Sequence, residues 1–284
     1  TRKESSAASD VYKRQEHETM TNFHSIDATQ VTNVTLNVKD LNKLTDFYSN
    51  VLGFSIEKQT NQQTVFNIGN LGYTLTLNEL NNGRQPEFRE AGLFHVAYLL
   101  PTRSDLADFL YHANNLNIAM GGGDHLVSEA LYFSDPEGNG IEVYHDRPSE
   151  DWVWRDGFVK MDTLEVDVND LMAQRSNEGW QGWPEEGKIG HLHLKTHNLE
   201  SAYEFYVEKL GFEHISNFPQ ALFMSTQKYH HHIATNTWQS NKIRTQNEQT
   251  YGLCHFDIYQ PNANTTHVTS PEGFDITIHG NETK

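Results

Sequence analysis

VTLNVKDLNKLTDFYSNVLGF, residues 34–54, has a near copy in LHLKTHNLESAYEFYVEKLGF, residues 192–212. The two stretches align without a gap at an offset of 158 residues. In each, an alternating apolar run typical of a strand precedes apolar residues at helical spacing. This repetition indicates that the chain is built from duplicated modules.

A second pair of repeats interleaves with the first. GLFHVAY at 92–98 matches GLCHFDI at 252–258, and each is followed by Pro-Glu-Gly and another alternating strand. Two kinds of unit therefore alternate along the chain. The repeats predict four modules, at 31–85, 91–147, 188–240 and 250–281.

The predicted helices have clear start and stop residues. Asp40 and Asn198 are suited to cap the helices of the first and third modules, and Gly53 and Gly211 to end them. Ser104 is the expected cap in the second module. Short strands follow each helix, so a complete module is interpreted as βαβββ. A module of about 50 residues cannot cover its own sheet, so modules must pair. The predicted fold class is α+β, with the fourth module too short for a helix.

The remaining segments are assigned by composition. Residues 1–19 are polar and lack hydrophobic periodicity, and we expect a disordered, non-native extension. The domains expected are an N-terminal pair of modules (31–147) and a C-terminal pair (188–281). Residues 148–187 show no strand pattern but contain four tryptophans, which predicts an ordered connecting arm.

Composition excludes several classes of protein. The formal net charge of −17 argues against nucleic acid or an anionic membrane as partner, and no apolar run approaches the length of a spanning helix. A single cysteine, Cys254, cannot form an intramolecular disulfide or a thiolate cluster, which favours the cytoplasm. The 16 histidines direct attention to metal or acid–base chemistry.

The repeats resemble the vicinal oxygen chelate superfamily, which includes glyoxalases, bleomycin-resistance proteins and extradiol dioxygenases. The resemblance rests on the Asp-Leu-x(5)-Phe-Tyr-x(3)-Leu-Gly-Phe helix, the Gly-Leu-x-His strand and the hairpin Asp135-Pro-Glu-Gly-Asn-Gly-Ile-Glu142. It covers nearly all of 31–281. It implies that paired modules form cup-shaped mixed sheets, with metal ligands on the first and last strands.

The repeat offsets place the candidate ligands. First-strand positions are occupied by Asn33, His95, His191 and His255, and last-strand positions by Glu142 and Thr277. Pairing of modules one with two, or three with four, gives an incomplete set. Pairing of two with three gives His95, His191 and Glu142, the arrangement of non-haem Fe(II) sites. Whether this pairing occurs within one chain or across a dimer stays open, as does the metal, with Mn, Zn or Ni as alternatives.

The resemblance also implies catalytic residues. His125-Leu-Val-Ser-Glu-Ala130, Tyr132 and the Asp-Pro-Glu-Gly turn match the dioxygenase branch, and His231 occupies a His-x-x-Ala setting on an expected last strand. His231 is the expected acid–base group, with Tyr132 and His125 acting on substrate oxygens, and the register of the catalytic histidine within His230–His232 stays open. Three neighbouring histidines are candidates for binding substrate or supporting the ligands: His193, His230 and His232.

The resemblance thus implies an Fe(II)-dependent extradiol dioxygenase, similar to the catechol 2,3-dioxygenase branch. Its partners would be a small catechol-type aromatic and O2, giving a muconic semialdehyde type product. Two alternatives share the fold: a metal-dependent lyase or isomerase like the glyoxalases, and a non-catalytic binding protein of the bleomycin-resistance kind. The oligomeric state, including a homo-oligomer, stays open.

Overall fold

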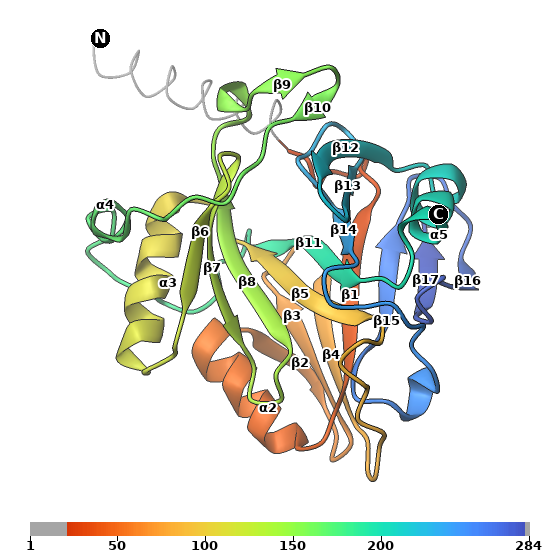
Figure 1. Ribbon diagram of the computed structural model, residues 1–284. Helices are drawn as coiled ribbons and strands as arrows, with labels where there is room; N and C mark the ends of the chain where they lie inside the picture. The colour runs from red at the N-terminus through yellow and green to blue at the C-terminus, as the bar shows by residue number, and fades with distance from the viewer. Residues whose placement is uncertain (1–21, 282–284) are drawn as a thin grey trace.

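The computed structural model describes residues 22–281, and the predicted extension at 1–19 lies outside this range. Two large sheets make up the fold (Figure 1). Modules two and three share an eight-stranded sheet, while modules one and four share a seven-stranded sheet. Both pairings occur within the one chain. The predicted α+β class and cup-shaped mixed sheets are confirmed.

The eight-stranded sheet has the order β12-β13-β14-β11-β5-β8-β7-β6. First strands β5 and β11 run antiparallel at its centre. Its members are β5 (Gly92–Leu99), β6 (Gly121–Asp124), β7 (Ser128–Ser134), β8 (Gly140–Asp146), β11 (Lys188–Lys195), β12 (Glu213–Phe218), β13 (Ala221–Ser225) and β14 (Ile233–Asn236).

The seven-stranded sheet has the order β16-β17-β15-β1-β4-β3-β2, with first strands β1 and β15 antiparallel at its centre. It repeats the arrangement of the other sheet, except that module four contributes three strands instead of four and has no helix after its first strand. Its members are β1 (Gln30–Val38), β2 (Ser55–Gln59), β3 (Gln63–Ile68), β4 (Tyr73–Glu79), β15 (Gly252–Tyr259), β16 (Thr266–Thr269) and β17 (Asp275–His279).

The helices of modules one and three begin where the sequence predicts. Asp40 accepts a hydrogen bond from the backbone N–H of Lys43 at the start of α2 (Leu41–Phe47), which continues as the π-helical turn η1 (Tyr48–Leu52). Gly53 ends it with φ +74°, a conformation that favours glycine.

Module three repeats this pattern. Asn198 caps α5 (Leu199–Ala202), which continues as the π-helical η3 (Tyr203–Lys209). The π-helical second halves were not predicted, because their wider turns leave no mark on the apolar spacing of the sequence.

The predicted cap of the second helix is wrong. The helix α3 (Arg103–Asn115) is capped by Thr102, and Ser104 lies within its first turn. Thr102 has an extended backbone, and its hydroxyl accepts from the backbone N–H of Asp105, whose carboxylate accepts from the backbone N–H of Thr102 in return. This reciprocal capping box satisfies two N–H groups that a cap at Ser104 would leave free.

The segment between modules two and three contains regular structure that the sequence did not predict. A 3-10 turn, η2 (Ser149–Asp151), leads into a two-residue hairpin of β9 (Trp154–Arg155) and β10 (Phe158–Val159) that packs beside β12. The short helix α4 (Val168–Met172) then packs on α3. One further 3-10 turn, η4 (Asn247–Gln249), precedes β15.

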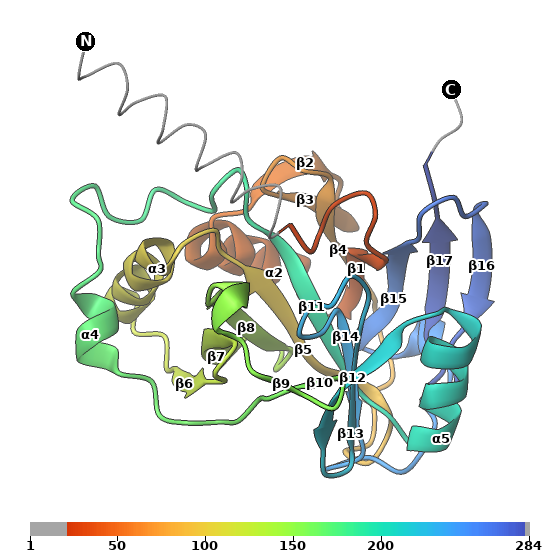
Figure 2. The ribbon, with the colours of Figure 1, turned by 90° about the horizontal axis from the view of Figure 1, so that it is seen from above.

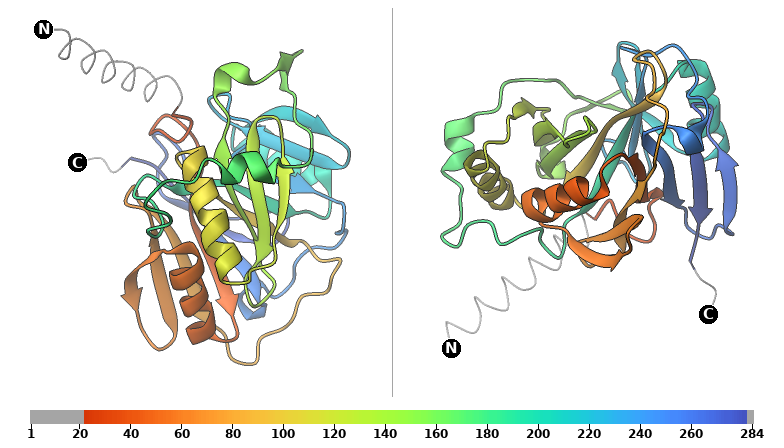
Figure 3. Two further views of the ribbon diagram at one scale, coloured as in Figure 1. Left: turned by 90° about the vertical axis from the view of Figure 1, so that its left-hand side faces the viewer. Right: turned by 90° about the horizontal axis from the view of Figure 1, so that it is seen from below.

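Helices α2 and α3 lie side by side on one side of the molecule (Figures 2 and 3). Phe133 of β7 packs between them, with its ring centroid 6.3 Å from that of Phe47 and 5.8 Å from that of Phe109. One apolar cluster runs through both pairs of modules. Within the described part of the chain, no helix has the length and apolarity needed to cross a membrane.

Candidate metal centre

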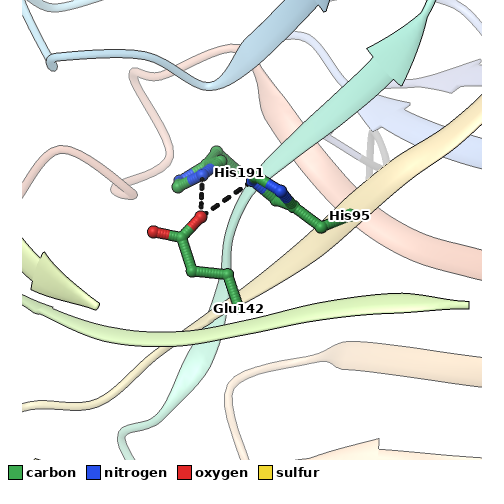
Figure 4. Close-up of side chains that lie close together, drawn as sticks. All are labelled: His95, Glu142 and His191. Atoms are coloured by element: carbon green, nitrogen blue, oxygen red, sulfur yellow. Dashed lines mark hydrogen bonds and ion pairs between the residues drawn. The ribbon is translucent and has the colours of Figure 1, made fainter. Parts of the chain in front are cut away.

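Three adjacent strands bring His95, His191 and Glu142 together. Ala97 of β5 pairs with His191 of β11 on one side and with Glu142 of β8 on the other. His95 lies two residues before Ala97 and therefore on the same face of β5. The small side chain of Ala97 leaves the space between the three longer ones open, so they converge above it (Figure 4).

The three side chains meet at one carboxylate oxygen. Oε2 of Glu142 lies 2.8 Å from Nε2 of His95 and 2.9 Å from Nε2 of His191. The three ligand atoms lie within 4.8 Å of one another, and all three residues are buried. His191 is aligned to hydrogen-bond to Glu142, whereas Nε2 of His95 has no hydrogen-bond partner despite its proximity.

This donor set fits a divalent metal ion. A buried imidazole nitrogen without a partner, aimed at a second imidazole and a carboxylate, is costly unless a ligand occupies the centre. Two nitrogens and one oxygen from three strands are the donors of facial-triad metal sites. Among residues 22–281, no other group of three such donors is arranged in this way.

Burial shapes the charges of the centre. Burial lowers the pKa of His191 to about 4, despite the opposing attraction of Glu142, so its imidazole is neutral as a metal ligand must be. Burial by itself would raise the pKa of Glu142, but the two histidines outweigh it and lower that pKa. The carboxylate is therefore ionised.

The centre opens into a cavity of about 280 Å³. Four other predicted residues lie in its wall: His125, Tyr132, His193 and His231. The rest of the wall is mostly apolar, from Phe94, Met161, Phe218, Phe223 and Trp238, with Asp162 and Thr163. A separate cavity of about 430 Å³, between Lys39 and Arg244, contains none of the predicted residues.

His125 and Tyr132 act as a pair. The ring Nδ1–H of His125 donates to the carbonyl oxygen of Asp162 at 2.9 Å, so in the neutral ring Nε2 accepts from the Tyr132 hydroxyl. Burial, followed by the nearby Glu142, raises the pKa of Tyr132, so the phenol keeps its proton. The preceding glycines form the strand β6 rather than a plain turn. A Cβ at Gly123 would lie 3.1 Å from the His125 ring.

His231 lies in the cavity wall but not on a strand. Its ring stacks on that of His191, with the centroids 3.8 Å apart. The expected last-strand position is wrong, because β14 begins at Ile233. Gln227 and Lys228 both have positive φ, and the tight turn they form delays the start of the strand. Burial lowers the pKa of His231, and the neighbouring imidazoles add to this effect.

The other candidate histidines divide into two groups. His193 lines the cavity, with Nε2 2.9 Å from the side-chain nitrogen of Asn236. His230 and His232 lie outside the cavity wall. His230 bonds to Asp146 at 2.6 Å, and Nε2 of His232 donates to the carbonyl oxygen of Phe23 at 2.8 Å. Neither is placed to contact a substrate in the cavity.

Two residues near the centre were missed by the sequence interpretation. Tyr144 of β8 packs on His191, and its hydroxyl oxygen lies 1.9 Å from where a Cβ of Gly190 would be. Asp146, at the end of the same strand, bonds to His230. Both follow Glu142 at even spacing, so strand alternation could have placed them on its face.

Comparison with known proteins gives consistent results. A family model described as "Glyoxalase/Bleomycin resistance protein/Dioxygenase superfamily" matches residues 30–143. Over 246 residues the chain is 37% identical to "Catechol-2,3-dioxygenase" of Bacillus subtilis (strain 168), which covers 85% of this chain and 86% of that protein.

Solved structures share the fold at low identity. A Bacillus subtilis structure provisionally described as a dioxygenase superposes with a TM-score of 0.61 at 12% identity, covering 91% of this chain and 87% of its own. A glyoxalase I variant from Zea mays gives a TM-score of 0.53 at 12% identity, covering 92% and 96%. These likenesses concern the arrangement of modules alone.

Proposed function

Because the chain belongs to the glyoxalase, bleomycin resistance and dioxygenase superfamily, we propose that it is a metal-dependent extradiol dioxygenase acting on a catechol-type ring. The observation that carries the proposal is the convergence of His95, Glu142 and His191 beside His231, Tyr132 and His125 in one cavity. Similarity to a named catechol-2,3-dioxygenase over most of the chain supports the reaction class.

The proposed ligands are His95, His191 and Glu142, and the proposed metal is Fe(II). Iron bound by these two imidazoles and this carboxylate would supply the redox chemistry that joins a catechol to O2. The single carboxylate leaves the centre a net positive charge, which favours binding of an ionised catechol oxygen.

His231 is the proposed acid–base residue. Its ring lies against His191 at the wall of the cavity, within reach of a substrate held at the metal centre. A neutral imidazole can take a proton from the substrate hydroxyl and return it when the O–O bond breaks. Burial keeps His231 neutral before substrate binds.

Tyr132 and His125 are the proposed substrate-orienting pair. The Tyr132 hydroxyl keeps its proton and already donates to His125, so it can turn to donate to a substrate oxygen instead. His193 also lines the wall of this cavity. His230 hydrogen-bonds to His231, and His232 hydrogen-bonds to the backbone of Phe23. We propose that both support His231 without contacting the substrate.

The cavity wall suggests the class of catechol. The aromatic and methionine side chains can pack on a ring and exclude water from the centre. No lysine or arginine lines this cavity among the described residues, so an acidic ring substituent would have no charged partner there. We therefore favour catechols with apolar substituents, cleaved to muconic semialdehyde type products. A cytoplasmic location stays a prediction from the sequence.

Anaerobically purified protein provides the test. We expect about one iron per chain, oxygen uptake with catechol and methylcatechols, a yellow ring-fission product, and weaker uptake with protocatechuate. Bound iron without oxygen uptake for any catechol would overturn the proposal. Tight binding of Zn, Ni or Mn with isomerisation of a thiol adduct would favour a glyoxalase-like lyase, and tight catechol binding without turnover would favour a sequestering protein.

A further inference from the structure

We propose that the cavity between Lys39 and Arg244 is a second binding site, separate from the metal centre, for a small molecule with two or more carboxylate or phosphate groups. The cavity has a volume of about 430 Å³ and lies where β5 and β15, the equivalent first strands of modules two and four, begin. Residues of all four modules line it, and none of them lines the cavity of the metal centre. The inference therefore does not depend on the proposed function.

Three basic side chains line this cavity without an ion pair to any carboxylate of the described residues: Lys39, Lys195 and Arg244. Nζ of Lys39 lies 5.0 Å from the centre of the Tyr251 ring, and Nζ of Lys195 donates to the carbonyl oxygen of Phe88 at 2.6 Å. The chain has 38 acidic residues against 21 basic ones, so carboxylate partners are plentiful. Three unpaired cations around one cavity indicate room for an external anion.

Arg244 is the most informative of the three cations, because its residue is only 4% exposed. Its side-chain nitrogens donate to Oδ1 of Asn247 and to the carbonyl oxygens of Thr250 and Tyr251, at 2.7 to 3.1 Å. These acceptors are neutral, and two of the five N–H groups have no acceptor among the described residues. Burial lowers the pKa of Arg244 to about 10, which leaves it charged at neutral pH, and burial also lowers the pKa of Lys195. A buried charge without a counter-ion is costly, and a bound anion would offset that cost.

The repeat equivalent of Arg244 has the carboxylate partner that Arg244 lacks. Arg84 and Arg244 each stand eight residues before the Gly-Leu that opens the first strand of modules two and four. Arg84 donates two hydrogen bonds to the carboxylate of Glu90, six residues further on, at 2.9 and 3.1 Å. The residue six positions after Arg244 is Thr250, which has no charge. The missing partner is therefore a specific difference between the repeats, and a ligand could take its place.

The acidic residues of the wall already have other partners. They are Glu87, Glu90 and Glu137. Glu90 pairs with Arg84 and Glu87 with Lys242, each at 2.9 Å, and Glu137 accepts from two backbone N–H groups before α2. Neither of the two basic partners lines the cavity. The wall and these partners together contain five basic side chains against three acidic ones, so the surroundings favour an anion.

The position of the cations indicates the class of ligand. Lys39 follows β1, Lys195 ends β11 and Arg244 precedes β15, so the three cations come from three separate segments. This arrangement favours a molecule with more than one anionic group. Lysine and arginine both bind carboxylates and phosphates. Gln85 and Asn139 add neutral donors and acceptors for the body of the ligand.

Isothermal titration calorimetry with tricarballylate and fructose 1,6-bisphosphate tests the site. Neither probe has the hydroxy-acid or pyrophosphate group that would extract a metal ion. At constant ionic strength, we expect at least one of them to bind once per chain with a Kd below about 1 mM, and acetate to show no saturation. The tighter probe identifies a polycarboxylate or a phosphorylated ligand. Absence of saturation by both probes up to about 10 mM would overturn the proposal, whether or not the chain is a dioxygenase.

Variants locate the binding. K39M and K195M should each weaken it about 10-fold or more, because each removes a charged contact. E87Q removes an exposed carboxylate from the wall and should tighten binding about two- to threefold. K58M is the matched control, since it makes the same change of charge on the exposed edge strand β2 and should leave the affinity within about twofold. Equal weakening in K58M, or none in K39M and K195M, would refute this site. Arg244 stays unaltered, because its guanidinium also holds the backbone before β15.

Discussion

The two sheets have the same arrangement of modules but different chemistry at equivalent positions. In the eight-stranded sheet, His95, His191 and Glu142 face one another, and Nε2 of His95 and Nδ1 of His191 have no hydrogen-bond partner. In the seven-stranded sheet, the equivalent positions hold His255, Asn33 and Thr277. Each of these is hydrogen-bonded close by: His255 to Asp257, Asn33 to Thr74, and Thr277 to His267.

The difference shows that the fold provides two similar cups, while the side chains make a metal centre of only one. A carboxylate at the last-strand position is the decisive change, because threonine at 277 offers no charge to balance a metal ion. Among the described residues, the seven-stranded sheet therefore has no donor set like that of the eight-stranded sheet. Four predictions test this contrast, from the largest expected effect to the smallest.

Exchange of the two equivalent histidines for alanine should give the largest contrast. H95A removes a proposed ligand, so we expect loss of bound metal and a drop in oxygen uptake of more than about 100-fold. Removing a residue that only supports a ligand typically costs about 10- to 100-fold. H255A should retain both, because His255 bonds only to Asp257. Metal content after dialysis and oxygen uptake measure the two variants. Equal metal loss in both would show that the two cups are not distinct.

A side chain at Gly190 should destabilise the eight-stranded sheet. Its Cβ would lie 1.9 Å from the Tyr144 hydroxyl oxygen, so we expect G190A to lower the free energy of unfolding by about 3 kcal/mol. In the other sheet, Thr32 is equivalent to Gly190 and His279 to Tyr144. There the position of the glycine already carries a side chain, and the Thr32 hydroxyl and Nε2 of His279 share a hydrogen bond of 2.8 Å. T32A should therefore cost only about 1 kcal/mol. Urea denaturation measures both, and similar losses would refute the contrast.

The ion pair of Glu129 and Arg103 has no equivalent in the seven-stranded sheet, because Arg103 lies on α3 and the fourth module lacks the corresponding helix. Burial of Glu129 opposes its ionisation, but hydrogen bonds from His145 and Arg103 lower its pKa to about 2, from 4.5 when unfolded. Its stabilisation is therefore complete above about pH 4.5 and is lost as the pH falls towards 2. E129Q should cost about 2 kcal/mol at pH 7 and progressively less at acid pH.

Thermal unfolding from pH 7 to pH 2.5 measures this effect. The control is D170N, which removes the exposed partner of Arg103 and should change stability by less than about 0.5 kcal/mol. A cost of E129Q that is the same at every pH would mean that packing, rather than charge, stabilises the pair.

The smallest expected effect concerns a link between the two halves. Glu137, in the hairpin of the eight-stranded sheet, accepts from the backbone N–H groups of Lys39 and Asp40 before α2. Its repeat equivalent, Glu272, is buried and accepts instead from the side-chain hydroxyl of Tyr206 in module three, at 3.1 Å. E137A should cost about 1 kcal/mol in urea denaturation. A loss of more than about 3 kcal/mol would show that this contact holds the halves together.

Much of the fold was predictable because duplication supplies its own internal comparison. The offset between the repeats aligned His191 with Asn33. In the structure both residues lie on first strands, His191 on β11 and Asn33 on β1. Alternation then accounts for the direction of Glu142. The caps at Asp40 and Asn198 were predictable because capping depends on the local sequence alone.

The remaining features depend on backbone details that residue types do not encode. Gln227 and Lys228 adopt positive φ, although neither is typical of that conformation. After this turn, His231 lines the cavity of the metal centre and His230 does not. Thr102 and Ser104 are both good caps, so only the observed extended backbone at Thr102 decides between them. The hairpin at β9 and β10 is too short to show alternation.

The pairing of the first and last modules also has a consequence for biosynthesis. Gln30 of β1 pairs with Tyr259 of β15, so β1 must wait for its partner until synthesis of the chain has passed β15. Until then, an apolar strand edge of module one is unpaired, while modules two and three can already fold. We expect slow, late closure of the seven-stranded sheet and a nascent chain that benefits from chaperones.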